Sequence, residues 1–157
     1  MKSFLNTVYT LCWLCVAFLY RPFVRCKPLP PKNIIISGFD RVGDLICESP
    51  LFRETCKAFP QARVTLLVSH TLKPLVEYNP HIKDFIETDM PEYKGIRGKF
   101  RFIQRIRAGR FDMYLEPGIN AALMLALMTL AGVGERIIMT SPIAELVTRI
   151  AKPLATR

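Results

Sequence analysis

Asp44 is the residue of this chain whose surroundings best suit it to chemistry. It follows Gly43 at the end of a short loop of small and charged residues, and that loop follows the apolar run 34–36. The apolar run predicts a buried strand, and the apolar-periodic segment that opens at Asp44 predicts a helix. An aspartate is ionised at neutral pH. At this position it could act as a general base that takes a proton from a sugar hydroxyl as that hydroxyl attacks an electrophilic carbon.

The same residues also have a structural interpretation, which the spacing alone favours. An aspartate at the start of a helix caps it by accepting a hydrogen bond from free backbone N–H groups. Gly43 before it would allow a tight turn. Asp44 is therefore a candidate N-cap and, as the alternative, a candidate general base.

Other catalytic and cofactor patterns do not occur in the sequence. Gly38 and Gly43 are five residues apart and no GxGxxG follows the first expected strand, which argues against a dinucleotide site. There is no GxSxG nucleophile motif. His70 and His81 lack metal-ligand spacing, so both are interpreted as loop or cap residues.

Alternating strands and helices must position these residues. The expected strands are 33–37, 63–68, 84–87, 113–116 and 136–139. The expected helices are 44–58, 72–78, 99–108 and 121–130, with one more amphipathic segment at 143–150. Pro50 predicts a kink or a restart of the first helix at Ser49. The alternation predicts a Rossmann-like α/β fold with a mostly parallel sheet and helices on both faces, whose carboxyl edge is the usual ligand site.

An apolar helix is expected to precede this domain. Residues 3–20 contain no charged side chain, and as a helix they would span about 27 Å, close to a bilayer core of roughly 30 Å. Basic residues are more numerous after this segment than before it, which favours a cytoplasmic location for the rest. We expect a spanning or interfacial anchor at 1–21, a basic proline-rich linker at 22–32 and a globular domain at 33–157. The alternative is a helix that packs on the domain.

The composition of the chain limits the classes of partner that it is expected to bind. The chain has 157 residues, which suits one domain, and half of them are hydrophobic. Its formal net charge of +9 favours anionic partners such as phosphorylated substrates or acidic lipid. Five cysteines form no zinc pattern, and free thiols suit a reducing compartment.

The segment 94–110 carries much of the positive charge. It contains seven basic residues and no acidic one. Ile96, Phe100, Ile103 and Ile106 form one apolar stripe at helical spacing. The favoured interpretation is an amphipathic helix that packs on the sheet and leaves a solvated basic face. The alternative is a contact with anionic lipid head groups or a phosphorylated acceptor. Nucleic acid is not an expected partner, because no recognition motif or stacking platform is present.

An ordered set of short motifs gives the chain a family resemblance. The motifs are Phe39-Asp40-Arg41-Val42-Gly43-Asp44, Ser49-Pro50-Leu51 with Arg53, Phe59-Pro60, Val64-Thr65-Leu66-Leu67-Val68, Glu77-Tyr78-Asn79-Pro80-His81-Ile82, Arg110-Phe111-Asp112, and Gly132 with Arg136-Ile137. No single motif is specific. In this order and spacing they resemble glycosyltransferase family 9, the heptosyltransferase-like enzymes of lipopolysaccharide assembly.

The resemblance implies an architecture and a set of site residues. Enzymes of this family have two Rossmann-like domains in the GT-B arrangement. The N-terminal domain mainly receives the acceptor and the C-terminal domain mainly binds the nucleotide-sugar donor. Transfer inverts the anomeric centre without a metal ion. By this resemblance Asp44 is the catalytic base. From the expected topology, the residues that shape the loop around Asp44 are Ser37, Gly38, Arg41 and Gly43, and the residues that line the same cleft at the end of a later strand are Glu116, Pro117 and Gly118.

The resulting expectation is the N-terminal portion of an inverting glycosyltransferase. It would move a heptose-like sugar from a nucleotide-sugar donor to a lipopolysaccharide-type acceptor at the cytoplasmic face of a bacterial inner membrane. Because the sequence holds no second Rossmann-like unit, we expect the donor domain to be missing. Another chain could then supply this domain in trans. We expect this chain alone to have little activity. The alternative is a non-catalytic, membrane-associated module that binds an anionic glycolipid or a partner protein.

Overall fold

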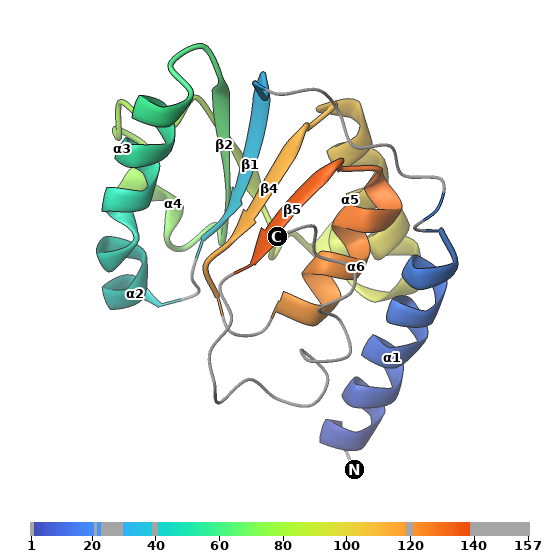
Figure 1. Cartoon of the computed structure of the whole chain (residues 1–157). Helices are drawn as coiled ribbons and strands as arrows, with labels where there is room; N and C mark the ends of the chain where they lie inside the picture. The colour runs from blue at the N-terminus through green and yellow to red at the C-terminus, as the bar shows by residue number, and fades with distance from the viewer. Residues whose placement is uncertain (1, 21, 23–29, 39–40, 119–120, 139–157) are drawn as a thin grey trace.

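A five-stranded parallel sheet forms the centre of the domain (Figure 1). The computed structural model describes residues 2–20, 22, 30–38, 41–118 and 121–138. The strands are β1 (Asn33–Ser37), β2 (Arg63–Val68), β3 (Asp84–Glu87), β4 (Met113–Glu116) and β5 (Glu135–Ile138). Their spatial order is β3-β2-β1-β4-β5, and every neighbouring pair is parallel. The predicted bounds of the first four strands are confirmed, and the fifth begins one residue earlier than predicted.

In the part of the chain that the structure describes, six α-helices and the short 3-10 turn η2 connect or flank the strands. The helices are α1 (Lys2–Tyr20), α2 (Val42–Cys47), α3 (Ser49–Ala58), α4 (Lys73–Val76), α5 (Gly95–Ala108) and α6 (Ala121–Ala131), and the turn is η2 (Pro91–Tyr93). The restart predicted at Ser49 is confirmed, since Pro50 lies in the first turn of α3 where its missing N–H costs nothing. The helix predicted at 72–78 is shorter, and α5 starts four residues earlier than predicted. The segment 143–150 lies outside the described residues.

Helices cover both faces of the sheet, as predicted (Figure 1). Successive side chains of β1 point to opposite faces, so Ile34 and Ile36 pack with Phe52 of α3 in one core. Ile35 points the other way and packs in a second core with residues of α1, α5 and α6. All three isoleucines have no exposed surface. The central strand that leads into the candidate site is therefore held from both sides.

Asp112 fixes the start of β1 against β4. Its Oδ2 accepts hydrogen bonds from the backbone N–H of Lys32 at 2.8 Å and of Asn33 at 3.0 Å. Its own N–H donates to the Asn33 carbonyl at 2.8 Å. These bonds join residues about eighty positions apart in the chain and set the register in which β1 and β4 reach the opposite edge of the sheet.

The first helix packs on the domain. Trp13, Leu14 and Ala17 of α1 are buried in the same core as α5 and α6. This agrees with the packing alternative for the N-terminal segment. Within the described part of the chain, no helix has the length and apolar character needed to cross a membrane.

Candidate functional site

The carboxyl ends of β1 and β4 meet at the point where the strand order reverses. From β1 the chain continues to β2 and β3 on one side, and β4 and β5 lie on the other side. Ile36 pairs with Leu115 in the register, so Ser37 and Glu116 leave the sheet at neighbouring positions. Ligands of open α/β sheets bind in the crevice at such a switch point. The structure thus brings together the two predicted groups of site residues.

Gly38 has a steric role at this edge. Its N–H donates to the Leu67 carbonyl of β2 at 2.8 Å, which extends the pairing of the strands beyond Ser37. A Cβ atom on Gly38 would lie 2.8 Å from the same oxygen, closer than carbon and backbone oxygen normally approach. The loop after β1 can therefore pass β2 this closely only because residue 38 has no side chain.

Asp44 lies inside α2 and does not cap it. The helix begins at Val42, and its N-cap residue is Arg41, whose side chain makes no capping hydrogen bond. Asp44 occupies the third position of the first turn, so the N-cap interpretation is wrong. A negative charge there is favoured by the free N–H groups and dipole of the helix. The Asp44 side chain is exposed at the carboxyl edge of the sheet and is open to a ligand.

Gly43 is not required by its surroundings. It is the second residue of α2, and a Cβ atom there would have nothing within 4 Å. The expectation that it supports a tight turn is therefore wrong. Arg41 and Gly43 are both exposed beside Asp44, whereas Phe39 and Asp40 lie outside the described residues. Only Gly38, among the predicted loop residues, has a demonstrated steric reason for its identity.

Glu116 organises the end of β4. Its carboxylate is 6% exposed, and its Oε1 accepts a hydrogen bond from the Gly118 N–H at 2.9 Å. Its Oε2 accepts a hydrogen bond from the phenol of Tyr114, which is fully buried. Burial and, next, the charge and hydrogen bond of Glu116 raise the pKa of Tyr114 well above its ordinary value, with a smaller opposing contribution from Ser37. Tyr114 therefore stays a neutral hydrogen-bond donor.

Glu48 is a site residue that the sequence analysis missed. It joins α2 to α3 and is only 5% exposed. Its negative charge also contributes to raising the pKa of Tyr114. The signal that could have identified it is its position between two helices, directly before the Ser49-Pro50 restart. The edge thus combines buried carboxylates and a phenol, which organise its interior, with the exposed carboxylate of Asp44, which can accept a hydrogen bond from a hydroxyl group of a ligand.

The predicted loop histidines make local contacts, His70 after the carboxyl end of β2 and His81 before the amino end of β3. The Nδ1 atom of His70 lies 2.7 Å from a Glu87 carboxylate oxygen, and the His70 backbone N–H donates to Asp89. The His81 backbone N–H donates to the side-chain oxygen of Asn79 at 3.0 Å. Among the residues that the structure describes, no group of three or more His, Cys, Asp or Glu side chains could hold a metal ion.

Comparison with known proteins gives matches among solved structures. No protein-family model and no curated protein matches the chain. The E. coli ADP-heptose lipopolysaccharide heptosyltransferase II matches with a TM-score of 0.58 and 20% sequence identity over 68% of this chain. A family 9 glycosyltransferase from Veillonella parvula matches with a TM-score of 0.59 and 22% identity over 69% of this chain. The E. coli heptosyltransferase WaaC with ADP-2-deoxy-2-fluoro heptose matches with a TM-score of 0.60 and 14% sequence identity over 80% of this chain.

These matches establish the fold. The chain spans 30%, 32% and 41% of the lengths of the three solved chains. The predicted fold class is confirmed: an all-parallel five-stranded α/β sheet that resembles the N-terminal domain of a GT-B glycosyltransferase. Over 68 to 80% of its length, this chain is structurally similar to heptosyltransferases of glycosyltransferase family 9.

Proposed function

We propose that this chain is the acceptor-binding portion of an inverting glycosyltransferase, which transfers a heptose-like sugar from a nucleotide-sugar donor to a lipopolysaccharide-type acceptor. The observation that carries the proposal is the exposed Asp44 carboxylate at the switch point of a sheet built like those of family 9 heptosyltransferases. Ser37 at the end of β1 and Glu116 at the end of β4 leave the sheet at neighbouring positions of the same edge.

Asp44 has the role of general base in this proposal. It accepts the proton of the acceptor hydroxyl while that oxygen bonds to the anomeric carbon of the donor sugar. The bond between that carbon and the diphosphate breaks, and the diphosphate leaves with the bonding electrons. The buried Glu116–Tyr114 pair acts indirectly, because its hydrogen bond to the Gly118 N–H holds the loop that forms the opposite wall.

The donor side needs a second domain. Because the chain spans 30 to 41% of the solved enzymes, we propose that another Rossmann-like domain binds the nucleotide and that it acts in trans if it belongs to a separate chain. No metal ion is needed in this scheme. The proposed location is the cytoplasmic face of a bacterial inner membrane, whose anionic surface is complementary to the net charge of +9.

The first test is acceptor binding by the full chain. Addition of an inner-core lipopolysaccharide oligosaccharide should shift backbone amide NMR signals of residues 37–44 and of Glu116 and Gly118. The matched variant Asp44→Asn should keep its fold and most of this binding, since the amide has nearly the same shape. Shifts confined to other parts of the domain, or no shifts, would contradict acceptor binding at the carboxyl edge.

The second test is transfer after a donor-domain chain and a nucleotide-heptose have been added. Loss of a positioned general base typically costs about 100-fold to 10,000-fold in rate, so Asp44→Asn should lower kcat by that amount with little change in KM. The control is Glu77→Gln, an exposed carboxylate at the end of α4, which should leave the rate unchanged. Equal rates for wild type and Asp44→Asn would remove Asp44 from this role. Binding without any transfer by the wild type would favour the non-catalytic module.

A further inference from the structure

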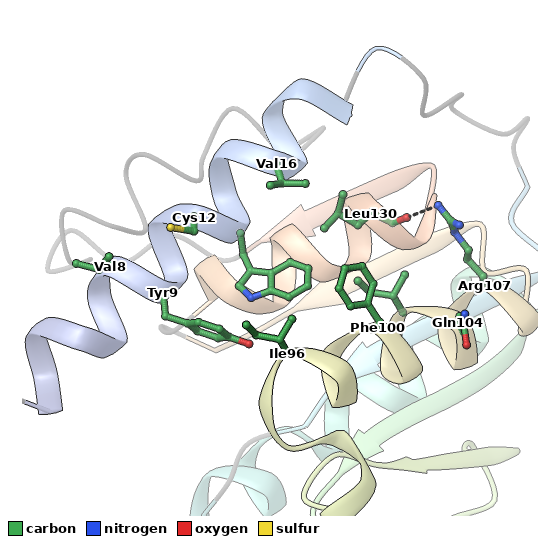
Figure 2. Close-up of a pocket in the computed structure, with 11 residues that line it drawn as sticks. Val8, Tyr9, Cys12, Val16, Ile96, Phe100, Gln104, Arg107 and Leu130 are labelled. Atoms are coloured by element: carbon green, nitrogen blue, oxygen red, sulfur yellow. Dashed lines mark hydrogen bonds between the residues drawn. The ribbon is translucent and has the colours of Figure 1, made fainter.

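A groove of about 720 Å³ lies between α1 and α5, on the opposite side of the sheet from Asp44 and α2 (Figures 1 and 2). Its size falls in the range of roughly 300–1,000 Å³ that is typical of ligand clefts. The residues that form its walls are Val8, Cys12 and Val16 of α1, and Ile96, Phe100 and Gln104 of α5. Trp13 also lines it. The lining is therefore almost entirely apolar.

The groove is a straight channel between two helices that run in the same direction. The Trp13 and Phe100 rings are 5.5 Å apart, and seven residues further along each helix Arg107 donates to the Tyr20 hydroxyl at 3.0 Å. On each helix the wall residues are four positions apart and cover eight positions, which corresponds to a length of about 12 Å along the helix. Arg107 also donates to the Leu130 carbonyl at 2.8 Å, so it ties α1, α5 and α6 together at one end of the channel (Figure 2).

The walls expose large apolar side chains to solvent. Ile96 is 61% exposed and Phe100 is 56% exposed, although both belong to the stripe that was expected to pack on the sheet. That expectation is confirmed only for Ile103 and Ile106, which are buried. Across the groove, Val8 and Val16 are 43% and 51% exposed. A contiguous apolar surface of this kind marks a place where an apolar partner binds.

Positive charge borders the same groove. Arg97, Arg101 and Arg105 follow one another every four residues, so they form an exposed stripe of α5 directly beside the stripe of Ile96 and Phe100. In the part of the chain that the structure describes, none of these three arginines has a carboxylate within 4 Å. Together with the net charge of +9, this stripe is complementary to an anionic group next to an apolar one.

We propose that the groove between α1 and α5 binds an anionic phospholipid of a bilayer surface, with one acyl chain along the apolar channel and the phosphate on the stripe of Arg97, Arg101 and Arg105. A phospholipid joins an apolar chain to an anionic phosphate, which matches the two adjoining stripes. Helices that dock in this way bury apolar side chains at the acyl boundary and attract anionic head groups through nearby basic residues. The proposal does not depend on glycosyl transfer, because no residue of the carboxyl edge takes part.

Trp13 provides a local probe. It is the only tryptophan of the chain and it lines the groove. The full chain is titrated with vesicles of phosphatidylcholine and phosphatidylglycerol in equal parts, whose acyl chains carry bromine, a short-range quencher of tryptophan fluorescence. We expect saturable quenching of Trp13, and much weaker binding to brominated vesicles of phosphatidylcholine alone. Binding to the anionic vesicles without quenching, or equal binding to both kinds, would overturn the proposal.

Matched arginine variants test the charged stripe. Since a basic residue near an anionic surface contributes about 1 kcal/mol, Arg97→Gln with Arg101→Gln should weaken binding about 5-fold per residue. The control is Arg53→Gln on α3, an arginine that is paired with Glu54 and should bind as the wild type does. Equal losses for Arg53→Gln and for the α5 variant would show a non-local charge effect and overturn the proposal.

A third comparison separates the phospholipid from other occupants of the groove. Phe100→Ser changes an exposed residue, so the fold should survive, as circular dichroism can verify, while Trp13 quenching falls. Tighter binding to vesicles that contain lipopolysaccharide than to phosphatidylglycerol vesicles of equal charge, if it persists with an excess of free inner-core oligosaccharide and falls in Phe100→Ser, would assign the groove to a glycolipid and overturn the proposal. A dimer in sedimentation whose formation prevents vesicle binding would assign it to a second copy of the chain and also overturn it.

Discussion

The two helical layers of this domain differ in the pairing of their basic side chains and in the exposure of individual apolar side chains. On the side of α3, α4 and β3, basic residues have acidic partners: Lys57 with Glu54, Arg63 with Asp84, and Lys73 with Glu87. On the side of α5, the described structure gives Arg97, Arg101 and Arg105 no such partner.

One phenylalanine from each layer shows a matching difference in exposure. Phe52 of α3 has no exposed surface, whereas Phe100 of α5 is more than half exposed. Both helices are amphipathic, so the difference comes from what packs against them. In the first layer the sheet completes the contacts, and in the second α1 stands beside α5 and leaves a channel between them. Both layers contain a buried core, and the channel between α1 and α5 is the part of the second layer that we propose serves binding.

The largest expected effect comes from truncating Phe52. Phe52→Ala removes a fully buried ring and should lower the free energy of unfolding by about 3–5 kcal/mol. Phe100→Ala should cost less than about 1 kcal/mol, because the residue is 56% exposed. Urea denaturation of both variants measures the difference. Similar costs for the two phenylalanines would break the comparison of the layers.

An intermediate effect is expected at Arg107, the arginine of α5 that has structural contacts. Arg107→Met removes the hydrogen bonds to Tyr20 and Leu130 and should cost about 1 kcal/mol. It should also shift Trp13 emission to longer wavelength as α1 loosens. Arg101→Met is the control and should change neither quantity. If Arg101→Met destabilises the protein as much as Arg107→Met does, the stripe is structural.

The smallest expected effect concerns the ion pairs of the first layer. Lys73 and, next, His70 lower the pKa of Glu87 below its ordinary value of 4.5. A lowered pKa in the folded state means that the pairing stabilises the fold above pH 4.5 and that this stabilisation is lost as the pH falls through the lowered value. The Tm of the wild type should therefore exceed that of Glu87→Gln slightly near neutral pH and approach it in acid. A Tm difference that grows as the pH falls would contradict the stabilising effect assigned to the pairing of Glu87.

Much of the fold could be predicted from the sequence. The first four strands are short apolar or β-branched segments between turn residues, and their bounds follow from that local pattern. The restart at Ser49 follows from the geometry of Pro50, which needs no N–H donor in a first helical turn. Alternation of strands and helices then leaves few topologies other than a parallel sheet, because crossovers are right-handed. The carboxyl edge was predicted as the site because open α/β sheets bind ligands at that edge.

Only the tertiary structure decided which side chains the site contains and how they are held. The restart at Ser49 places Glu48 at a junction of two helices, but its burial depends on how α2 and α3 meet the sheet. The need for glycine at position 38 comes from a carbonyl of Leu67, which belongs to another strand. The exposure of Ile96 and Phe100 depends on where α1 docks, although their spacing predicted a buried stripe. Local pattern therefore determined the elements, while contacts between residues distant in sequence determined the site and the groove.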